Sequence, residues 1–184
     1  MHKPPVTIIL PVFNEVETID GTLTSLVDQD YEGSLAVVVA DGGSTDGTRE
    51  KLNDWARSTS NVTVINNERR VQSYGLNAAA EMSDAPLLVR ADGHTHYAPD
   101  YVRQSVETVI ETGAAAGGRM NPVGTSPFGR AVAAAMNSRH TTGPARCPHA
   151  DRREEVATVY RGAFPREDFL ELGGFRAFPS GAAE

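Results

Sequence analysis

The chain has 184 residues, a length that fits one domain whose core needs no disulfide or structural metal to be stable. Its formal net charge of -7 argues against the basic face that a nucleic-acid partner normally requires. The acidity does not exclude a nucleotide ligand, because backbone N–H groups and a bound cation can hold phosphates locally. We therefore expect no nucleic-acid partner, whereas a small nucleotide ligand is still compatible with the charge.

Two features bear on the compartment of the protein. The single cysteine, Cys147, cannot form an intrachain disulfide, which fits a reducing compartment. Residues 1–5 precede a short strand-like run rather than the apolar stretch of a signal peptide, and no stretch approaches the roughly 18 apolar residues of a membrane helix. We expect a soluble, cytoplasmic domain. We also expect it to be a piece of a longer protein, with any membrane association supplied by segments beyond Glu184.

The first half of the chain alternates strand-like and helix-like hydrophobic patterns. The run 6–10 is nearly continuously apolar and β-branched, whereas Ile19, Leu23 and Leu26 form one stripe of a helix. Further strands are predicted at 35–40, 62–65 and 86–91, and further helices at 48–58, 72–82 and 99–112. This alternation predicts one α/β domain over residues 1–184, with a mainly parallel, Rossmann-like sheet flanked by helices.

The second half of the chain has weaker patterns. A strand is predicted at 114–120, an alanine-rich helix at 126–137, and a polar loop at 140–153. A late strand at 156–160 and a short helix at 166–172, ended by two glycines, complete the prediction.

Polar residues follow three of the predicted strands. These segments are Pro11-Val12-Phe13-Asn14-Glu15, Asp41-Gly42-Gly43-Ser44-Thr45-Asp46-Gly47, and Asp92-Gly93-His94. Ligands of open parallel sheets bind beyond the carboxyl ends of the strands, where neighbouring strands bring such segments together. We therefore expect Glu15, Asp41 and Asp92 to surround one crevice.

The segment after the second predicted strand suits a flat ligand. Gly42 and Gly43 allow the backbone to approach closely, and Asp41 can accept a hydrogen bond from an imide N–H such as that of uracil. The same residues also fit an ordinary strand-to-helix turn in which Asp46 only caps the helix. The spacing does not match a calcium loop, and neither a dinucleotide fingerprint nor a Walker loop is present.

Asp92 and His94 stand two residues apart and can point the same way from an extended or turned backbone. A carboxylate beside an imidazole suits Mn²⁺, and a pyrophosphate would complete the ligand shell of Mg²⁺ or Mn²⁺. The alternative is that His94 and His96 are polar loop residues before a helix.

In this order, the three segments resemble the motifs of family 2 glycosyltransferases of the GT-A fold. The resemblance extends to Gly173-Gly174-Phe175, which is similar to a segment near the acceptor site of that family. The Asp-Gly-His version of the metal motif resembles bacterial exopolysaccharide enzymes of the succinoglycan type. The resemblance implies inverting transfer of a sugar from a nucleotide-diphosphate sugar, with UDP as the expected nucleotide. The acceptor would be a hydroxyl of a glycan or of a lipid-linked sugar in polysaccharide biosynthesis.

The resemblance also implies roles for individual residues. Those expected to contact the donor or acceptor are Pro11, Asn14, Glu15, Asp41, Gly43, Arg69, Asn77, Asp92 and Arg161. Asp92, assisted by His94, would bind the Mg²⁺ or Mn²⁺ that bridges the two phosphates. Because His94 replaces the usual carboxylate, the identity of the metal is open.

The catalytic base of the resembling family is the aspartate of a Glu-Asp pair shortly after the Gly-Gly-Phe segment. Glu184 is the candidate for the first member of that pair, which would place the base beyond the chain and make turnover by this piece poor. An alternative function is a non-catalytic module that only binds a nucleotide or nucleotide sugar. A nucleotidyltransferase is disfavoured, because residues 11–15 are not the glycine- and basic-rich loop that such enzymes carry.

Overall fold

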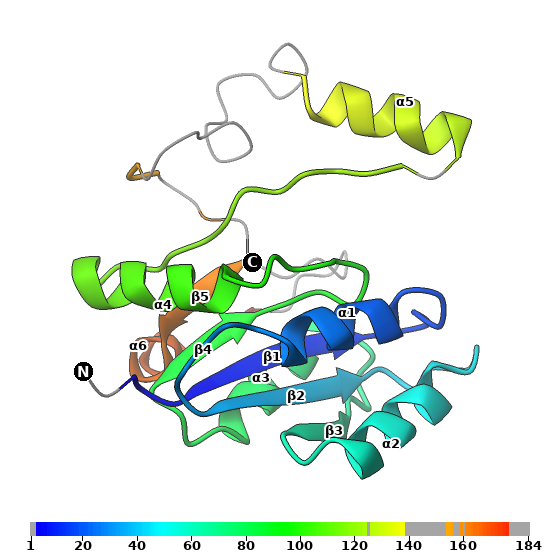
Figure 1. Cartoon of the computed structure of the whole chain (residues 1–184). Coiled ribbons are helices and arrows are strands. Elements are labelled where there is room, and N and C mark those ends of the chain that lie inside the picture. Colours follow the sequence, from blue (N-terminus) through cyan, green and yellow to red (C-terminus); the bar gives the residue numbers. More distant parts are fainter. Residues whose placement is uncertain (1–2, 125, 139–153, 157–158, 160, 177–184) are drawn as a thin grey trace. The chain divides into compact units, whose positions relative to one another are not determined.

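The computed structural model describes residues 3–124, 126–138, 154–156, 159 and 161–176 (Figure 1). The chain forms two compact units, one made of Met1–Ala116 with Gly162–Glu184 and the other of Gly117–Arg161. We call the first the sheet unit and the second the α5 unit.

The sheet unit contains a five-stranded sheet in the order β3-β2-β1-β4-β5. The strands are β1 (Val6–Val12), β2 (Leu35–Asp41), β3 (Val62–Asn66), β4 (Leu87–Arg90) and β5 (Gly162–Pro165). β1 to β4 run parallel, and β5 pairs antiparallel with β4. The predicted α/β class with a mainly parallel sheet is confirmed.

Helices cover both faces of this sheet (Figure 1). They are α1 (Ile19–Val27), α2 (Thr48–Ser58), α3 (Gln72–Glu81), α4 (Tyr101–Thr112) and α6 (Arg166–Glu171). The helices α1, α2 and α4 pack on one face, and α3 and α6 pack on the other. The continuous apolar runs of the central strands follow from this arrangement, because alternate side chains meet a helix layer on each side.

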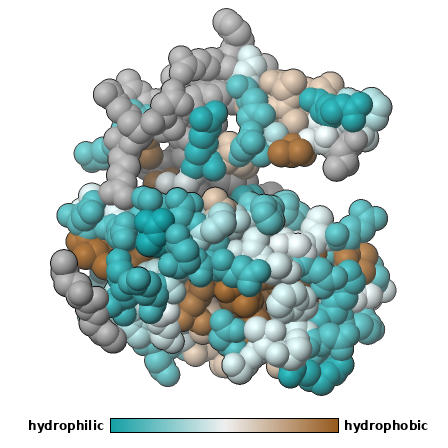
Figure 2. Space-filling view, in the orientation of Figure 1, coloured by the Kyte–Doolittle hydropathy of each residue, from teal (hydrophilic) through white to brown (hydrophobic). Residues whose placement is uncertain are grey.

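The core shows this alternation directly in β1. Ile8 and Leu10 pack with α1, α2 and α4, whereas Ile9 packs with α3, and all three are fully buried. Full burial of such a side chain contributes about 1.5–3 kcal/mol. On the face shown in Figure 2, hydrophilic and neutral residues cover most of the sheet unit, and apolar residues form small separate patches.

Several element boundaries differ from the predictions. α4 begins at Tyr101, so Pro99 precedes its first turn, and the predicted strand at 114–120 is a single bridge between Ala116 and Ala163. Of the predicted strand at 156–160, residues 157, 158 and 160 lie outside the described residues, as does the predicted polar loop at 140–153. The strand described in this region is β5, closer to the C-terminus.

The α5 unit contains α5 (Pro127–Met136), close to the predicted helix. Its start follows from the sequence: the Ser126 hydroxyl accepts the Gly129 N–H at 2.9 Å, and Pro127 occupies the first turn. Across the part of the chain that the structure describes, no helix combines the length and the apolar character needed to cross a membrane.

Candidate nucleotide site

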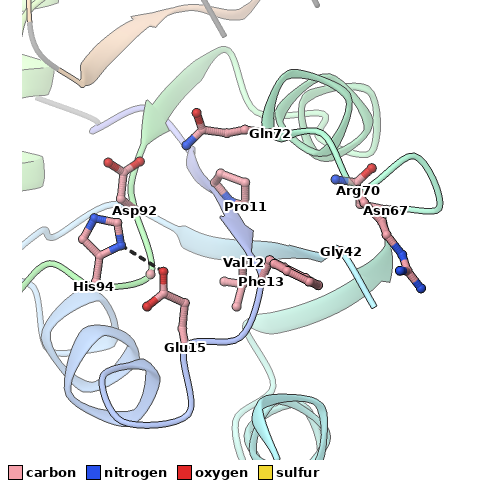
Figure 3. A pocket seen from close by; sticks show the side chains of 11 residues that line it. Pro11, Val12, Phe13, Glu15, Gly42, Asn67, Arg70, Gln72, Asp92 and His94 are labelled. Atoms are coloured by element: carbon pink, nitrogen blue, oxygen red, sulfur yellow. Dashed lines mark hydrogen bonds and ion pairs between the residues drawn. The ribbon is translucent and has the colours of Figure 1, made fainter. Parts of the chain in front are cut away.

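The carboxyl ends of β1, β2 and β4 lie at one edge of the sheet, as the parallel register requires. Val12 at the end of β1 pairs with Asp41 at the end of β2, and β4 runs parallel to β1 on its other side. A cavity of about 260 Å³ opens at this edge (Figure 3). Its lining residues are Pro11, Val12, Phe13, Glu15, Gly42, Asn67, Arg70, Gln72, Asp92, Gly93 and His94.

Acidic groups and His94 form one side of this cavity, and Arg70 and Asn67 form the opposite side (Figure 3). The Glu15 carboxylate is 2.9 Å from His94 Nδ1 and also accepts the Thr18 hydroxyl at 3.1 Å. This polarity, with acids facing an arginine, suits a cation and a phosphate held side by side.

Asp92 is positioned by a backbone hydrogen bond and lies near the guanidinium of Arg90. Its N–H donates to the Tyr97 hydroxyl at 2.8 Å, and Arg90 Nε lies 3.8 Å from its Oδ1. The residue is only 6% exposed, yet it lines the cavity. The next residue, Gly93, is fixed through its carbonyl, which accepts the hydroxyls of Thr18 and Thr22, both at 2.9 Å.

A second cavity of about 310 Å³ adjoins the first and shares Gly42, Asn67 and Arg70 with it. Its lining is completed by Asp41, Gly43, Arg49, Asn66 and Glu68. The structure therefore brings Glu15 and Asp92 to one cavity and Asp41 to its neighbour, at the same sheet edge.

The carboxylate of Asp41 is fully buried and already hydrogen bonded. Its Oδ1 accepts the Ser44 hydroxyl at 2.5 Å and the Ser44 N–H at 3.1 Å. Its Oδ2 lies 2.6 Å from Nη2 of Arg49 in α2. These contacts compensate the cost of burying a charge, which would otherwise be several kcal/mol.

Asn14 joins the turn after β1 to the loop after β2. Its N–H donates to the Ser44 hydroxyl at 2.9 Å, and its Oδ1 accepts the Thr45 N–H at 2.9 Å. Its φ of 54° is left-handed, a conformation that asparagine tolerates better than most residues. Asn14 is not among the residues lining either cavity, so its described contacts are with the protein.

Asp46 connects the same loop to the start of α2. It accepts the hydroxyl and the N–H of Thr48 at 2.6 and 3.0 Å, and the Val16 N–H at 3.1 Å. The hydrogen bond from the Thr48 hydroxyl is the main reason why the pKa of the Asp46 carboxyl is lowered. The N-cap of α2 is Gly47, so Asp46 lies one residue before the cap position and bonds the first N–H of the helix, while Asp41 and Gly43 line a cavity.

Of the two adjacent arginines, Arg70 reaches the cavities. An added Cβ at Gly43 would lie at an ordinary contact distance of 3.5 Å from the Arg70 guanidinium, so the φ of 79° rather than lack of space favours glycine here. The guanidinium of Arg69 instead lies over the Tyr74 ring, 4.3 Å from its centre. Arg69, the predicted contact, is therefore not among the lining residues of either cavity, whereas Arg70 lines both.

The remaining predicted site residues lie elsewhere. Asn77 lines neither cavity, and its amide exchanges two hydrogen bonds with the backbone of Phe175, at 2.9 and 3.0 Å. Arg161 has a φ of 56° and belongs to the α5 unit. Glu184 lies outside the described residues.

A cation at this edge would need ligands beyond protein side chains. Among the described residues, no group of three His, Cys, Asp or Glu side chains is placed to hold a metal ion. Asp92 and His94 nevertheless line one cavity, and Mg²⁺ in particular is commonly bound by one or two carboxylates together with substrate phosphates. The donor set therefore fits a cation that arrives with a phosphorylated ligand.

Several lining residues are not among those predicted from the sequence, for example Asn67, Gln72 and Arg49. Asn66 ends β3 and Asn67 follows it, so the rule that places residues at the carboxyl ends of parallel strands also applies to them. Arg49 gave no such signal, because an arginine in the first turn of a helix is ordinary in a sequence.

An open, mainly parallel sheet with polar cavities at the carboxyl ends of its strands is typical of nucleotide-binding α/β proteins. The chain belongs to glycosyl transferase family 2, whose sequence profile matches residues 7–158. Its fold is the GT-A fold of solved glycosyltransferases.

Individual relatives agree with this assignment. The chain is 38% identical over 135 residues to the succinoglycan biosynthesis protein ExoA of Rhizobium meliloti, covering 72% of this chain and 41% of ExoA. It is similar to the mannosyltransferase PcManGT of Pyrobaculum calidifontis, solved with GDP-Man and Mn²⁺, with 26% identity and a TM-score of 0.69. That match covers 96% of this chain and 48% of PcManGT. TarS of S. aureus, solved with UDP, shares the fold with a TM-score of 0.70 at 16% identity, over 94% of this chain and 50% of TarS.

Proposed function

We propose that this chain is the donor-binding part of an inverting glycosyltransferase that acts in polysaccharide biosynthesis. It would take a nucleoside-diphosphate sugar, with UDP as the expected nucleotide, and transfer the sugar to a hydroxyl of a glycan or of a lipid-linked acceptor. The pair of adjoining cavities at one sheet edge carries this proposal, because it offers separate places for a base and for a diphosphate.

The proposed diphosphate position is the cavity that contains Asp92. Asp92 and His94 would hold Mg²⁺ or Mn²⁺ together with phosphate oxygens, and Arg70 on the opposite side would meet the remaining phosphate charge. The cation supplies charge stabilisation to the departing diphosphate. Glu15 would orient His94 through the 2.9 Å contact at Nδ1, which leaves Nε2 for the ligand side.

The proposed acceptor side includes Gly173-Gly174-Phe175, and Arg161 is proposed separately as a substrate contact. Asn77 would act there indirectly, by fixing Phe175. Glu184 is the proposed first member of the Glu-Asp pair that contains the catalytic base, and we treat residues 1–184 as part of one glycosyltransferase domain that works in the cytoplasm. Membrane contact and the full activity would depend on the remainder of a longer protein, since the chain spans less than half of ExoA.

A thermal-shift panel tests the donor assignment. Ligands that bind only the native state raise the melting temperature by mass action. We expect UDP and UDP-sugars to raise it, and more so with Mn²⁺ or Mg²⁺ present. A nucleotide response that is indifferent to both the metal and the sugar would favour the non-catalytic binding module, and no response to any nucleotide would refute the proposal.

A further inference from the structure

Arg49 connects the ends of two strands at the second cavity. It lies in the first turn of α2, and its Nη2 is 2.6 Å from Asp41 Oδ2 and 2.6 Å from Asn66 Oδ1. The two N–H groups of Nη2 therefore donate to these two acceptors. A guanidinium has five N–H donors, so others remain for a ligand at this cavity.

Arg49 also controls access to Asp41. The Asp41 side chain is 0% exposed, whereas that of Arg49 is 28% exposed. A ligand entering the cavity therefore meets the guanidinium first and reaches Asp41 Oδ2 only beside it. The Ser44 hydroxyl bonds Oδ1, and the Ser44 N–H lies 3.1 Å from Oδ1 and 3.3 Å from Oδ2. A ligand N–H would therefore share Oδ2 with Arg49 and take the place of the longer Ser44 contact.

We infer that Arg49 is a base-positioning residue that acts with Asp41 as a donor–acceptor pair. This inference rests on the proposed function and specifies the ligand of the second cavity. The pair would select a nucleobase with a ring N–H next to a carbonyl, the chemistry shared by uracil and guanine. Adenine and cytosine present a ring nitrogen without hydrogen beside an amino group at that edge, so both positions would be mismatched.

Binding measurements with four nucleotides test this selection. Affinities for UDP, GDP, ADP and CDP would be measured by calorimetry on the 184-residue chain at one fixed Mn²⁺ concentration. We expect the tighter of UDP and GDP to bind at least about fivefold more tightly than both ADP and CDP, the lower limit for a good bidentate pair. The comparison of the UDP and GDP affinities then shows whether the pair selects uracil or guanine.

Substitution of Arg49 should remove selectivity rather than binding in general. Arg49→Ala should weaken the preferred nucleotide about tenfold and leave ADP within about threefold, because the diphosphate contacts persist. Arg49→Lys keeps the charge but not the two-pronged geometry, and should recover only part of the selectivity. Arg57→Ala is the matched control, since Arg57 lies on the same helix and pairs with exposed Asp54.

The outcomes separate this inference from the proposed function. Equal weakening of all four nucleotides by Arg49→Ala would mean a purely structural role and would overturn the inference. Tight but unselective binding by the unsubstituted chain would also overturn it, while leaving nucleotide-sugar binding intact. If Arg49→Ala does not fold, Arg49→Lys decides, and an unchanged selectivity ratio there is contrary to the inference.

Discussion

At the residue scale, the carboxylates at the sheet edge are held in two different ways. Asp41 is fully buried and bonded to Ser44 and Arg49, so its orientation is set by the protein. Asp92 is 6% exposed, lines the cavity of about 260 Å³, and has Arg90 Nε 3.8 Å away. A rigid acid suits recognition of a base, and an acid at the cavity wall suits a cation that arrives with its ligand.

The proposed metal role of Asp92 can be tested with Asp92→Asn. The amide keeps the size of the side chain but is a poor ligand for Mn²⁺. The Mn²⁺-dependent part of the UDP affinity should therefore fall at least about tenfold, because even changes in residues that only support metal ligands lower metal affinity by that much. Calorimetric titrations of UDP with Mn²⁺ and with EDTA measure that part. Asp84→Asn, at an exposed loop position, is the control, and an unaltered metal response in Asp92→Asn would contradict the assignment.

Asp20 provides a pH-dependent prediction. Lys51 and then Trp55 donate to its carboxylate, at 2.6 and 3.0 Å, and lower its pKa from 3.8. Because the folded pKa is depressed, this stabilisation is present above about pH 4 and is lost as the pH falls through the folded value. Asp20 is 52% exposed, so Asp20→Asn should lower the free energy of unfolding by only about 0.2–1 kcal/mol at pH 7.

Urea denaturation of Asp20→Asn and of the unsubstituted chain at a series of pH values measures this difference. The two curves should converge toward pH 3. A difference that stays constant, or that grows on acidification, would show that the contacts with Lys51 and Trp55 are not its source.

At the element scale, α3 connects the first cavity, which Gln72 lines, to the Gly173-Gly174-Phe175 segment, which Asn77 contacts. The amide of Asn77 on α3 bonds twice to the backbone of Phe175, and Gly174, with a φ of 70°, packs directly on it. The Phe175 ring meets Phe164 and Phe169 at centroid distances of 6.4 and 5.1 Å. This arrangement fixes the Gly-Gly-Phe segment on β5 and α6 through α3.

Asn77→Ala distinguishes this anchoring role from direct donor contact. Removal of the amide leaves two backbone groups of Phe175 unsatisfied, and the free energy of unfolding should fall by about 1–3 kcal/mol. The affinity for UDP should stay within about twofold, because Asn77 lines neither cavity. Chemical denaturation and calorimetry give the two values. Asn53→Ala, at an exposed position of α2, is the control, and a large loss of affinity without loss of stability would favour donor contact.

At the scale of the whole molecule, the central strand β1 organises the sheet unit. It pairs with both β2 and β4, and its alternate residues enter both core layers. The site is built on the ends of these strands, so its geometry depends on the packing beneath it. Disturbing the core should therefore affect folding and nucleotide binding together.

Leu10→Ala tests this dependence. Leu10 is fully buried, and its truncation leaves a cavity that should cost about 2–5 kcal/mol of unfolding free energy. Met82→Ala, at a residue that is 56% exposed, should change stability by less than about 0.5 kcal/mol. Urea unfolding followed by near-UV circular dichroism and by UDP binding should give coincident midpoints. Separate midpoints would show that the site does not unfold with the core.

The sequence by itself determined the fold class and the sheet edge at which the site lies. Period-2 and period-3.6 patterns identify elements whose residues are neighbours in the chain, and the parallel-sheet rule then places the residues after each strand. The sequence-based prediction failed where a residue pattern fits an element but the packing around that segment in the folded chain does not support it. The strand predicted at 114–120, for example, is a single bridge at Ala116.

Only the tertiary structure decided which of several chemically similar residues serve the site. It brought Arg70 rather than Arg69 to the cavities, turned the amide of Asn77 toward Phe175, and placed Arg49 between Asp41 and Asn66. The physical reason is that such choices depend on the direction of a side chain and on partners distant in sequence. A one-dimensional pattern contains the spacing of residues along an element, but not the neighbours that packing brings against it.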